Sequence, residues 1–374
     1  MAKFKIAWLP GDGVGNEVME AARIVLDALK LDAEYIPGDI GWEFWKSEGN
    51  PLPDRTIDIL NSTDCALFGA ITSKPKGAAQ KELAPELKGK GHVYSSPIVG
   101  LRQLLNLHTN MRPCKAFDGN PLNYRDDIDL VVFRENTEGL YAGVEYRPVP
   151  HELRKEMARF NPKLKKFDHV EPEDMAITLR IITRKGAETI VRDAFDYAEK
   201  FARPSVTVVE KPNVLRETSG LFVEVAREVA KEYPEIELWE TNIDAMCMWL
   251  VKNPQIYSVI VTSNLFGDIT SDLCAQLVGG LGFASAANIG DDYAIFEPTH
   301  GSAPKYFGQY KVNPCAMLMA AKLMLEYLGE QEMADKLEAG LAQTIREGKV
   351  KTYDMGGLHT TLDVAKEVVR NMGL

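Results

Sequence analysis

The sequence predicts an α/β protein with a largely parallel sheet or two linked α/β layers. Apolar, β-branched runs alternate with segments of helical period along most of the chain, as they do in βαβ units. The first run, Phe4 to Leu9, enters the glycine turn Pro10 to Gly15 and then a helical pattern. That turn reads GxGxG rather than GxGxxG, and no acid ends a clear second strand, which argues against an ordinary Rossmann fold.

The next elements follow in chain order. The pattern predicts a strand from Cys65 to Thr72 that ends in a polar turn, and a charged, helix-compatible, mobile surface piece at 76–90. Helical spacing then places Leu101, Leu104 and Leu105 on the core face of a helix. Pro113 disfavours a helical conformation of the residue before it, so this helix should end earlier.

The middle of the chain contains a strand at 127–133 and then a stretch, 146–173, that is rich in charge and proline and has no clean period. We expect this stretch to be an arm that contacts a second subunit. A flexible glycine turn is expected at 279–288. The other expected strands are at 178–183, 205–210, 237–240 and 258–262, and the other expected helices at 188–201, 221–233, 245–251, 316–328 and 333–347.

Composition limits the partners of the chain. The formal net charge of −11 argues against nucleic acid or an anionic membrane, so an anionic substrate would need a local cationic pocket. The 5 cysteines are scattered without a CxxC pair, which favours reduced thiols in a cytoplasmic protein over disulfides or a zinc site. The residues from Met1 show no signal segment, and no run approaches the roughly 18 apolar residues of a membrane helix.

A pair of acids marks the stretch from Tyr257 to Leu273. After a strand, Asn264 and Gly267 punctuate the chain before a helical segment in which Asp268 and Asp272 stand four residues apart. Both carboxylates would project from one helix face, close enough to share a divalent cation. The alternative is that Asp268 caps the helix and Asp272 is a solvated first-turn acid.

Four longer stretches are more specific in combination. They are LPGDGVGNEV at 9–18, LR followed ten residues later by RP at 101–113, RENTEGLYAG at 134–143, and SNLFGDITSDL at 263–273 with FEPTHGSAP at 296–304. Together, and in this order, they resemble the β-decarboxylating dehydrogenases, the family of isocitrate, homoisocitrate and 3-isopropylmalate dehydrogenases. The resemblance extends from about residue 3 to residue 370.

The resemblance implies an isopropylmalate dehydrogenase-like two-domain fold with an intersubunit arm. The large α/β domain would comprise residues 1–107 and 279–374, and the small domain, which includes the dimer interface, residues 108–138 and 181–278. Residues 139–180 would form the arm. The family relationship also implies a cleft between the domains and a homodimer with shared active sites, with a small-molecule substrate and neither nucleic acid nor membrane as a partner.

The same resemblance implies the chemistry. A 2-hydroxy-3-carboxy acid would be oxidised by hydride transfer to NAD(P), and the product would lose its 3-carboxylate as CO2 to leave an enolate. A divalent cation, Mg2+ or Mn2+, would chelate the hydroxyl and the neighbouring carboxylate, lower the pKa of the hydroxyl and stabilise the enolate. By motif position, Asp268 and Asp272 match the family's metal ligands, and Asp244 matches the ligand from the other subunit.

Arginines and a proton-handling pair complete the implied site. The three arginines that match the family's carboxylate-binding residues are Arg102, Arg112 and Arg134, and guanidinium forks suit carboxylates. Lys211 would remove the hydroxyl proton, directly or through water, and Tyr141 would return one to the enol carbon. The arginines would depress the pKa of Lys211 once metal is bound. Otherwise Tyr141 is a packing residue and Lys211 a surface lysine.

Seven residues match the family's cofactor contacts. They are Thr72 and Ser73 at the nicotinamide end, His300, Gly301 and Asn313 around the adenine and its ribose, and Lys305 and Tyr306 beside them. Lys305 and Tyr306 resemble the NADP-using members, in which a lysine neutralises a 2′-phosphate that a carboxylate would repel. Gly357 resembles the NAD-using members, because NADP enzymes have an arginine there. NADP is therefore expected, with NAD as the alternative.

Substrate choice in this family is set just before Arg102. Ser96 matches a serine of isocitrate enzymes, whereas Ile98 replaces their asparagine. The run YSSPIVGLR at 94–102 looks closest to homoisocitrate dehydrogenases and lacks the acid and two leucines of isopropylmalate enzymes. The AGVE sequence after Tyr141, the long arm and the Lys305 loop favour isocitrate, which the tricarboxylic acid cycle converts to 2-oxoglutarate and CO2. A non-catalytic regulatory subunit is the alternative of another class, against which the complete set of proton-handling and metal-ligand residues argues.

Overall fold

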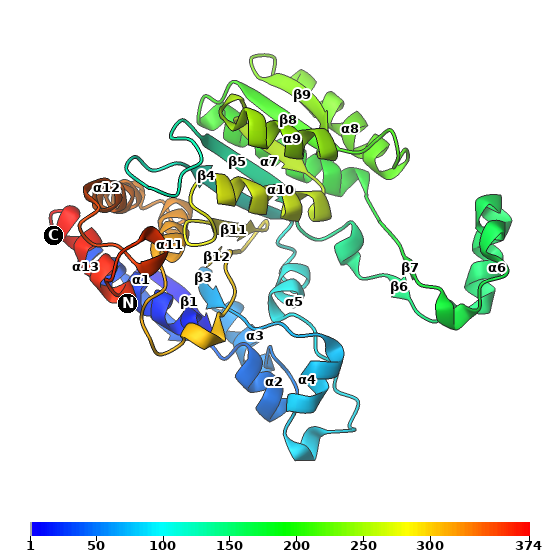
Figure 1. Cartoon of the computed structure of the whole chain (residues 1–374), viewed down its shortest axis with the longest axis horizontal. Coiled ribbons are helices and arrows are strands. Elements are labelled where there is room, and N and C mark those ends of the chain that lie inside the picture. The colour runs from blue at the N-terminus through cyan, green and yellow to red at the C-terminus, as the bar shows by residue number, and fades with distance from the viewer. Residues whose placement is uncertain (1) are drawn as a thin grey trace.

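The computed structural model describes residues 2–374, which form a mixed ten-stranded sheet with helices on both faces and an arm that carries a two-stranded sheet (Figure 1). Met1, where the expectation of no signal segment begins, lies outside the described residues. The strands are β1 (Phe4–Gly11), β2 (Ala33–Pro37), β3 (Cys65–Ala70), β4 (Thr109–Lys115), β5 (Asp129–Glu135), β6 (Glu145–Tyr146), β7 (Ile177–Thr178), β8 (Ser205–Glu210), β9 (Glu237–Asn242), β10 (Val259–Thr262), β11 (Ser285–Ile289) and β12 (Ala294–Pro298).

The order of strands in the main sheet is β2-β1-β3-β12-β11-β4-β5-β10-β8-β9. Most neighbouring strands are parallel, but β11 pairs antiparallel with β12 and with β4, and β4 pairs antiparallel with β5. The α/β class is therefore confirmed, while the centre of the sheet is antiparallel. The helices are α1 (Val14–Leu29), α2 (Trp42–Glu48), α3 (Asp54–Leu60), α4 (Lys76–Glu82), α5 (Pro97–Leu104), α6 (His151–Phe160), α7 (Arg184–Lys200), α8 (Thr218–Val229), α9 (Ile243–Lys252), α10 (Asn264–Leu277), α11 (Cys315–Tyr327), α12 (Gln331–Glu347) and α13 (Thr361–Asn371).

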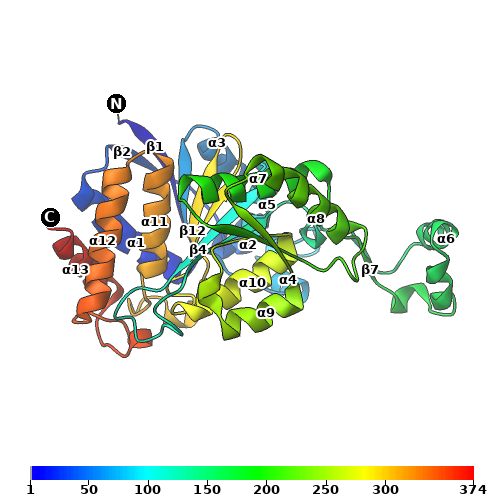
Figure 2. The same cartoon turned by 90° about the horizontal axis from the view of Figure 1, so that it is seen from above.

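Separate apolar clusters cover the two halves of the sheet. One cluster packs α1, α11, α12 and α13 against β1, β3 and β12, so both chain ends share a core (Figure 2). Two further clusters cover opposite faces of β5 and β10, one with α7 and α8 and the other with α9 and α10, because successive strand residues point to opposite faces. The expected division into two domains and an arm stays a prediction. Within residues 2–374, no helix is long and apolar enough to cross a membrane.

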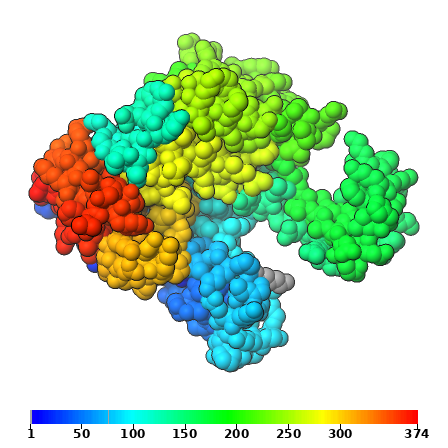
Figure 3. Space-filling model, viewed as in Figure 1, coloured from blue at the N-terminus to red at the C-terminus, as the bar shows by residue number. Residues whose placement is uncertain are grey.

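The arm extends away from the rest of the chain (Figures 1 and 3). Gly139 and Ile181 join its two ends through backbone hydrogen bonds of 2.7 and 3.3 Å. Beyond β6 it contains a regular helix, α6, although the sequence showed no clean period there. Arg154 in α6 donates a 2.6 Å hydrogen bond to the carbonyl of Val170, which ties the helix to the returning segment.

Some expected elements differ from the observed ones because of packing that local sequence does not show. Segment 76–90 contains the expected helix, α4, and lies mostly at the surface, but Ala79 and Leu83 are buried against Trp42 and Trp45. Leu104 was expected in the core but is 54% exposed, because α5 ends there and Leu101 takes the buried position.

Capping and strand pairing account for other differences. Helix α7 begins four residues earlier than expected because the Thr183 side chain caps it by accepting a hydrogen bond from the Gly186 N–H. The final helix, α13, was not expected, although Thr360 and Asp363 form a capping box at its start. The end of the expected turn at 279–288 forms β11 instead.

Candidate active site

Helix α10 carries both aspartates of the expected metal site. Asp268 and Asp272 lie in its second and third turns, and the N-cap is Ser263, so the interpretation of Asp268 as a cap is wrong. Gly267 does not punctuate the chain but lies inside this helix. A Cβ at Gly267 would lie 2.6 Å from the Cβ of Arg134, so glycine is needed for the close approach of α10 to β5.

Two of the expected arginines converge on Asp268. Arg134 is 1% exposed, and its Nη1 donates to Asp268 Oδ1 while its Nε and Nη2 donate to Asn264 Oδ1 at 2.9 and 2.8 Å. Arg112 Nη2 lies 3.7 Å from the same oxygen of Asp268, and its Nη1 lies 3.2 Å from Asp272 Oδ1. The two arginines meet because they lie on the neighbouring antiparallel strands β4 and β5.

Tyr141 completes this group. Its hydroxyl donates a 2.5 Å hydrogen bond to Asp268 Oδ2, and its ring centroid lies 5.0 Å from the guanidinium carbon of Arg134. Burial raises the pKa of Asp268, but the charge of Arg134, the bond from Tyr141 and the charge of Arg112 together hold that pKa below its ordinary value. Burial and the bond to Asp268 raise the pKa of Tyr141. At neutral pH the carboxyl is therefore ionised and the phenol protonated.

The charges of the three expected arginines interact. Burial is the largest cause that lowers the pKa of Arg134 to about 10, and the positive charges of Arg112 and Arg102 lower it further. The negative charge of Asp268 acts in the opposite direction. Partial burial and the charge of Asp268 raise the pKa of Asp272, with Arg112 opposing. The structure therefore gathers cations and carboxylates at one place, as a site for an anionic substrate and a metal requires.

Sequence reasoning missed two residues that hold Arg102. Arg102 Nε donates to Asn288 Oδ1 at 3.0 Å, and its Nη2 donates to Glu297 Oε1 at 3.1 Å. Asn288 is fully buried, and the same oxygen also accepts from Asn110 at 2.7 Å and from Asn136 at 3.0 Å. Glu297 lies in the FEPTHGSAP stretch, so the resemblance of that stretch could have identified it. No local sequence pattern marks Asn288.

Lys211 and Asp244 form a separate pair. Lys211 follows β8, and its ammonium donates to Oδ1 of Asp244 in the first turn of α9, which lowers the pKa of Asp244. Among residues 2–374 this is the one ion pair of Lys211, and none of its hydrogen bonds reaches Tyr141 or Asp268. Within this described range, no three His, Cys, Asp or Glu side chains gather as a metal cluster. One chain thus brings the expected site residues together as two groups.

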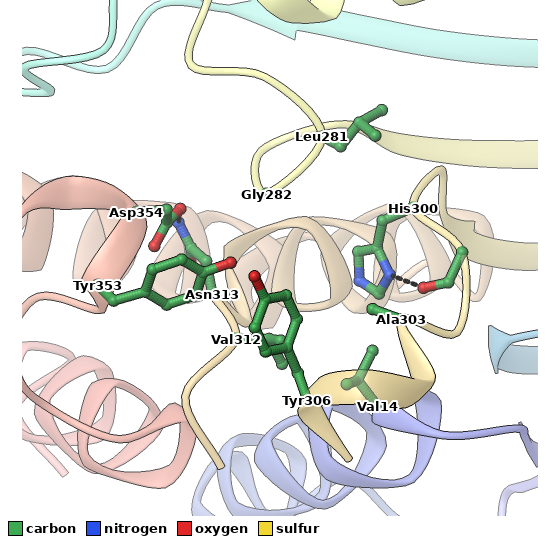
Figure 4. A pocket seen from close by; sticks show the side chains of 11 residues that line it. Val14, Leu281, Gly282, His300, Ala303, Tyr306, Val312, Asn313, Tyr353 and Asp354 are labelled. Carbon is green, nitrogen blue, oxygen red and sulfur yellow. Dashed lines mark hydrogen bonds between the residues drawn. The ribbon is translucent and has the colours of Figure 1, made fainter. Parts of the chain in front are cut away.

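Two cavities share His300 and Gly301. The first has a volume of about 280 Å³, and Figure 4 shows Tyr306, Asn313, Tyr353 and Asp354 around it. The second, of about 220 Å³, is lined by residues from the expected substrate and nicotinamide contacts and by two further residues, Ile98 and Glu297. These lining residues are Ser73, Ser96, Ile98, Arg102, Arg112 and Glu297. Eight of the expected site residues therefore line these two cavities, and two of the eight, His300 and Gly301, belong to both.

The residues between the cavities fit a ligand that extends into both. Nε2 of His300 is buried and has no hydrogen-bond partner among the described residues, and burial lowers the pKa of this imidazole. Thr72 lies next to Ser73, and its backbone N–H donates a 2.8 Å hydrogen bond to Oδ2 of Asp12. Asp12 was not among the residues expected at the site. A dinucleotide has the two ends and the polar groups that such an elongated site can accept.

The rim of the first cavity carries more positive charge than the sequence analysis expected. Lys305 Nζ lies 4.7 Å from the ring centroid of Tyr306. Lys311 Nζ lies 4.4 Å from the same centroid and 5.5 Å from the ring centroid of Tyr353. The bond with Lys305, then that with Tyr353, and the charges of both lysines lower the pKa of Tyr306. Lys311 was not expected at the site, because it lies outside the four sequence stretches that carry the resemblance to the family.

The chain is similar over nearly its whole length to known dehydrogenases. Residues 5–368 match the family model described as isocitrate/isopropylmalate dehydrogenase. The 3-isopropylmalate dehydrogenase of Archaeoglobus fulgidus is 42% identical, over 97% of this chain and 98% of that protein. Protein DlpA of Legionella pneumophila is 40% identical over 98% of this chain, which spans 58% of DlpA. The crystal structure of isocitrate dehydrogenase from Methylococcus capsulatus is 38% identical, with a TM-score of 0.86 and coverage of 99% of this chain and 100% of that chain.

Proposed function

The chain belongs to the isocitrate/isopropylmalate dehydrogenase family, and from this premise we propose that it converts isocitrate to 2-oxoglutarate and CO2 with NADP and a divalent cation. Members of this family are NAD(P)-dependent β-decarboxylating dehydrogenases acting on small molecules. The observation that carries the substrate class is the gathering of three arginines. Arg102 and Arg112 line one cavity, and Arg112 and Arg134 both contact Asp268, which suits a substrate with more than one carboxylate.

Ser96 supports isocitrate among the possible substrates. It is the N-cap of α5 but makes no side-chain capping hydrogen bond, so its hydroxyl is available to a ligand in the cavity that it lines with Arg102. The positive end of the helix dipole favours a carboxylate there. The isopropyl group of isopropylmalate would place an apolar surface against the same groups.

Homoisocitrate is the second candidate. It keeps the same three carboxylates but has one more methylene, and the sequence at 94–102 resembles homoisocitrate dehydrogenases. The homoisocitrate dehydrogenase of Methanocaldococcus jannaschii is 40% identical, over 98% of this chain and 96% of that protein. Ile98, which lines the cavity, offers the extra methylene an apolar contact.

Each residue group has a role in the proposed reaction. The three arginines would hold the substrate carboxylates, and Lys211 would accept the proton of the 2-hydroxyl. NAD(P), when bound, would supply the acceptor for the hydride. After CO2 leaves, the protonated Tyr141 donates its proton to the enolate carbon, consistent with the raised pKa of its hydroxyl.

Asp268 and Asp272 fit a divalent cation. Both are carboxylates on one helix face, the ligand type that Mg2+ and Mn2+ prefer, and Asp268 is ionised at neutral pH. The pKa of Asp272 is raised in part by the charge of Asp268, and a cation between them would relieve this repulsion. When bound, the cation polarises the substrate hydroxyl and stabilises negative charge on oxygen.

We further propose that two chains complete each active site. Lys211 and Asp244 are paired with each other, so both would enter the partner's site together, where Asp244 joins the partner's Asp268 and Asp272. Helices α9 and α10 carry exposed apolar side chains, including Met248 at 57%, Val251 at 50% and Ile269 at 50% exposure, which suits burial in a dimer interface. The predicted small domain would contain this interface.

NADP preference is expected to depend on both lysines at the rim of the first cavity. The double substitution Lys305→Gln/Lys311→Gln should raise the KM for NADP about 10-fold, ~1.4 kcal/mol, because two charges near the 2′-phosphate are lost. The KM for NAD should stay within about twofold, because NAD lacks this phosphate. Initial rates with each cofactor measure the effect, and Lys336→Gln, at an exposed position of α12, is the control. Equal losses with both cofactors would contradict the assignment.

The test of the proposed function is the initial rate of nicotinamide reduction with isocitrate, homoisocitrate and 3-isopropylmalate, each with NADP and NAD, in Mg2+ or Mn2+. The highest kcat/KM is expected for isocitrate with NADP, and EDTA should abolish turnover. A higher value for homoisocitrate would identify the second candidate. Absence of turnover in every combination would instead favour the non-catalytic regulatory subunit.

A further inference from the structure

A buried ion pair lies between three segments that carry candidate catalytic residues. Glu210 ends β8 with a side chain that is 0% exposed, and Arg180, where the arm returns, is 13% exposed. Arg180 Nη2 donates to Glu210 Oε2 at 2.9 Å and to Oε1 at 3.2 Å. A buried ion pair destabilises the fold unless further hydrogen bonds satisfy both charged groups. The other hydrogen-bond partners of Arg180 and Glu210 therefore identify the segments that the pair joins.

The first segment held by the pair contains Lys211. Ser219 Oγ donates to Glu210 Oε2 and accepts a 3.3 Å hydrogen bond from the backbone N–H of Lys211. Arg180 Nη1 donates to the same Ser219 oxygen at 3.0 Å and to Thr218 Oγ1 at 2.7 Å. The loop between β8 and α8, which begins at Lys211, is thereby closed across the ion pair.

The second segment is the start of α10. Arg180 Nη2 donates to the Oγ of Ser263, the N-cap residue, at 2.7 Å. The backbone N–H of Ser263 donates to Glu210 Oε1 at 3.2 Å. The guanidinium carbon of Arg180 also lies 5.2 Å from the ring centroid of Phe266 in the first turn. These contacts fix where α10 begins, and therefore where Asp268 lies.

The third segment contains Tyr141. The backbone on both sides of Arg180 is bonded to the chain that surrounds this tyrosine, because Leu179 N–H donates to the Val144 carbonyl at 2.9 Å and Ile181 pairs with Gly139. Displacement of Arg180 would therefore move the Tyr141 segment as well.

We infer that Arg180 and Glu210 are positioning residues that set Lys211, helix α10 and the Tyr141 segment in one fixed arrangement. The inference rests on the proposed function, which assigns roles to these segments. Neither residue lines the two cavities at His300. In the proposed dimer, Lys211 and Tyr141 of one chain face different active sites, so this ion pair also sets the spacing between the two sites.

Two variants separate positioning from stability. Arg180→Lys keeps a cation for Glu210 but loses the fork that reaches Thr218, Ser219 and Ser263 together. The double variant Arg180→Gln/Glu210→Gln removes both charges, so that no buried charge is left unpaired. The control is Arg227→Gln/Glu240→Gln, which removes another two-bonded arginine–glutamate pair, with bonds of 2.6 and 2.7 Å, from the exposed surface between α8 and β9.

We expect kcat to fall on the order of 10- to 100-fold in both test variants, because small displacements of catalytic groups have effects of this size. The KM for the cofactor should stay within about twofold, since the pair does not line the His300 cavities. Arg180→Lys should lose kcat even at temperatures where it is fully folded by circular dichroism. A kcat for Arg180→Lys equal to that of the wild type, or losses matching the control, would overturn the inference.

Failure of the proposed function gives a different result, because the wild type and the control would then also be inactive with every substrate. In that case amide hydrogen exchange decides the question. Arg180→Lys should raise exchange both in the loop from Lys211 to Thr218 and in the first turn of α10. Unchanged exchange in these two segments would overturn the positioning role without reference to turnover.

Discussion

Substitution of Lys211 by methionine is expected to lower kcat by about 10²- to 10⁴-fold, the range that one general base contributes. Methionine preserves the length and apolar stem of lysine but can neither accept the hydroxyl proton nor pair with Asp244. The expected loss is in kcat rather than in the KM for the cofactor, because Lys211 does not line either cavity at His300. Steady-state rates with isocitrate and NADP measure it.

The matched control is Lys336→Met, which removes an exposed lysine of α12 far along the chain from either group of site residues. Its kcat should remain within about twofold of the wild type. Circular dichroism should show that both variants are folded. If Lys211→Met retains most of its kcat, Lys211 is not the base, and its pairing with Asp244 is structural.

Mixing two inactive variants is expected to restore activity, which is the second prediction with a large effect. Tyr141→Phe and Lys211→Met are each expected to be nearly inactive as homodimers. A dimer of one chain of each kind contains one site with an intact Tyr141 group and an intact Lys211 group, provided that the groups come from different chains. Random exchange should therefore restore about a quarter of the wild-type activity, because half of the dimers are mixed and each has one working site.

Coexpression of the two differently tagged variants and purification through both tags gives the mixed dimer directly. Its activity per dimer should be about half that of the wild type, since one site in two is intact. The control is a mixed dimer of two Lys211→Met chains with different tags, which has no intact site. Absence of recovery in a proven mixed dimer would show that each active site lies within one chain.

The sequence predicted the fold class, whereas it predicted only the local part of the geometry of the candidate site. The spacing of Asp268 and Asp272 placed both on one helix face, because helical geometry is local. The position of Lys211 beside Asp244 could not be predicted, since it depends on the pairing of β8 with β9 and on the helix that follows. Lys211 was expected beside three arginines, but within one chain its ion-pair partner is a carboxylate.

Residues that act through tertiary contacts were the ones missed. Asn288 belongs to no charge or helix pattern, yet it gathers Arg102, Asn110 and Asn136 across three segments. Arg180 was read as part of a short strand, and its bond to Glu210 joins residues 30 positions apart. Gly267 was read as punctuation before the helix, because a lone glycine has no side chain to show that a strand lies against it.

The contact at Gly267 gives the active site one wall that substitution can scarcely move. Arg134 and Asp268 flank the place where α10 lies against β5 without room for a methyl group, so backbone packing rather than side-chain length sets their separation. The wall around Ser96 and Ile98 has no such restriction, since side chains at the start of α5 form it. Adaptation to a longer or more apolar substrate would therefore occur at the α5 wall, while the groups proposed to perform the reaction keep their places.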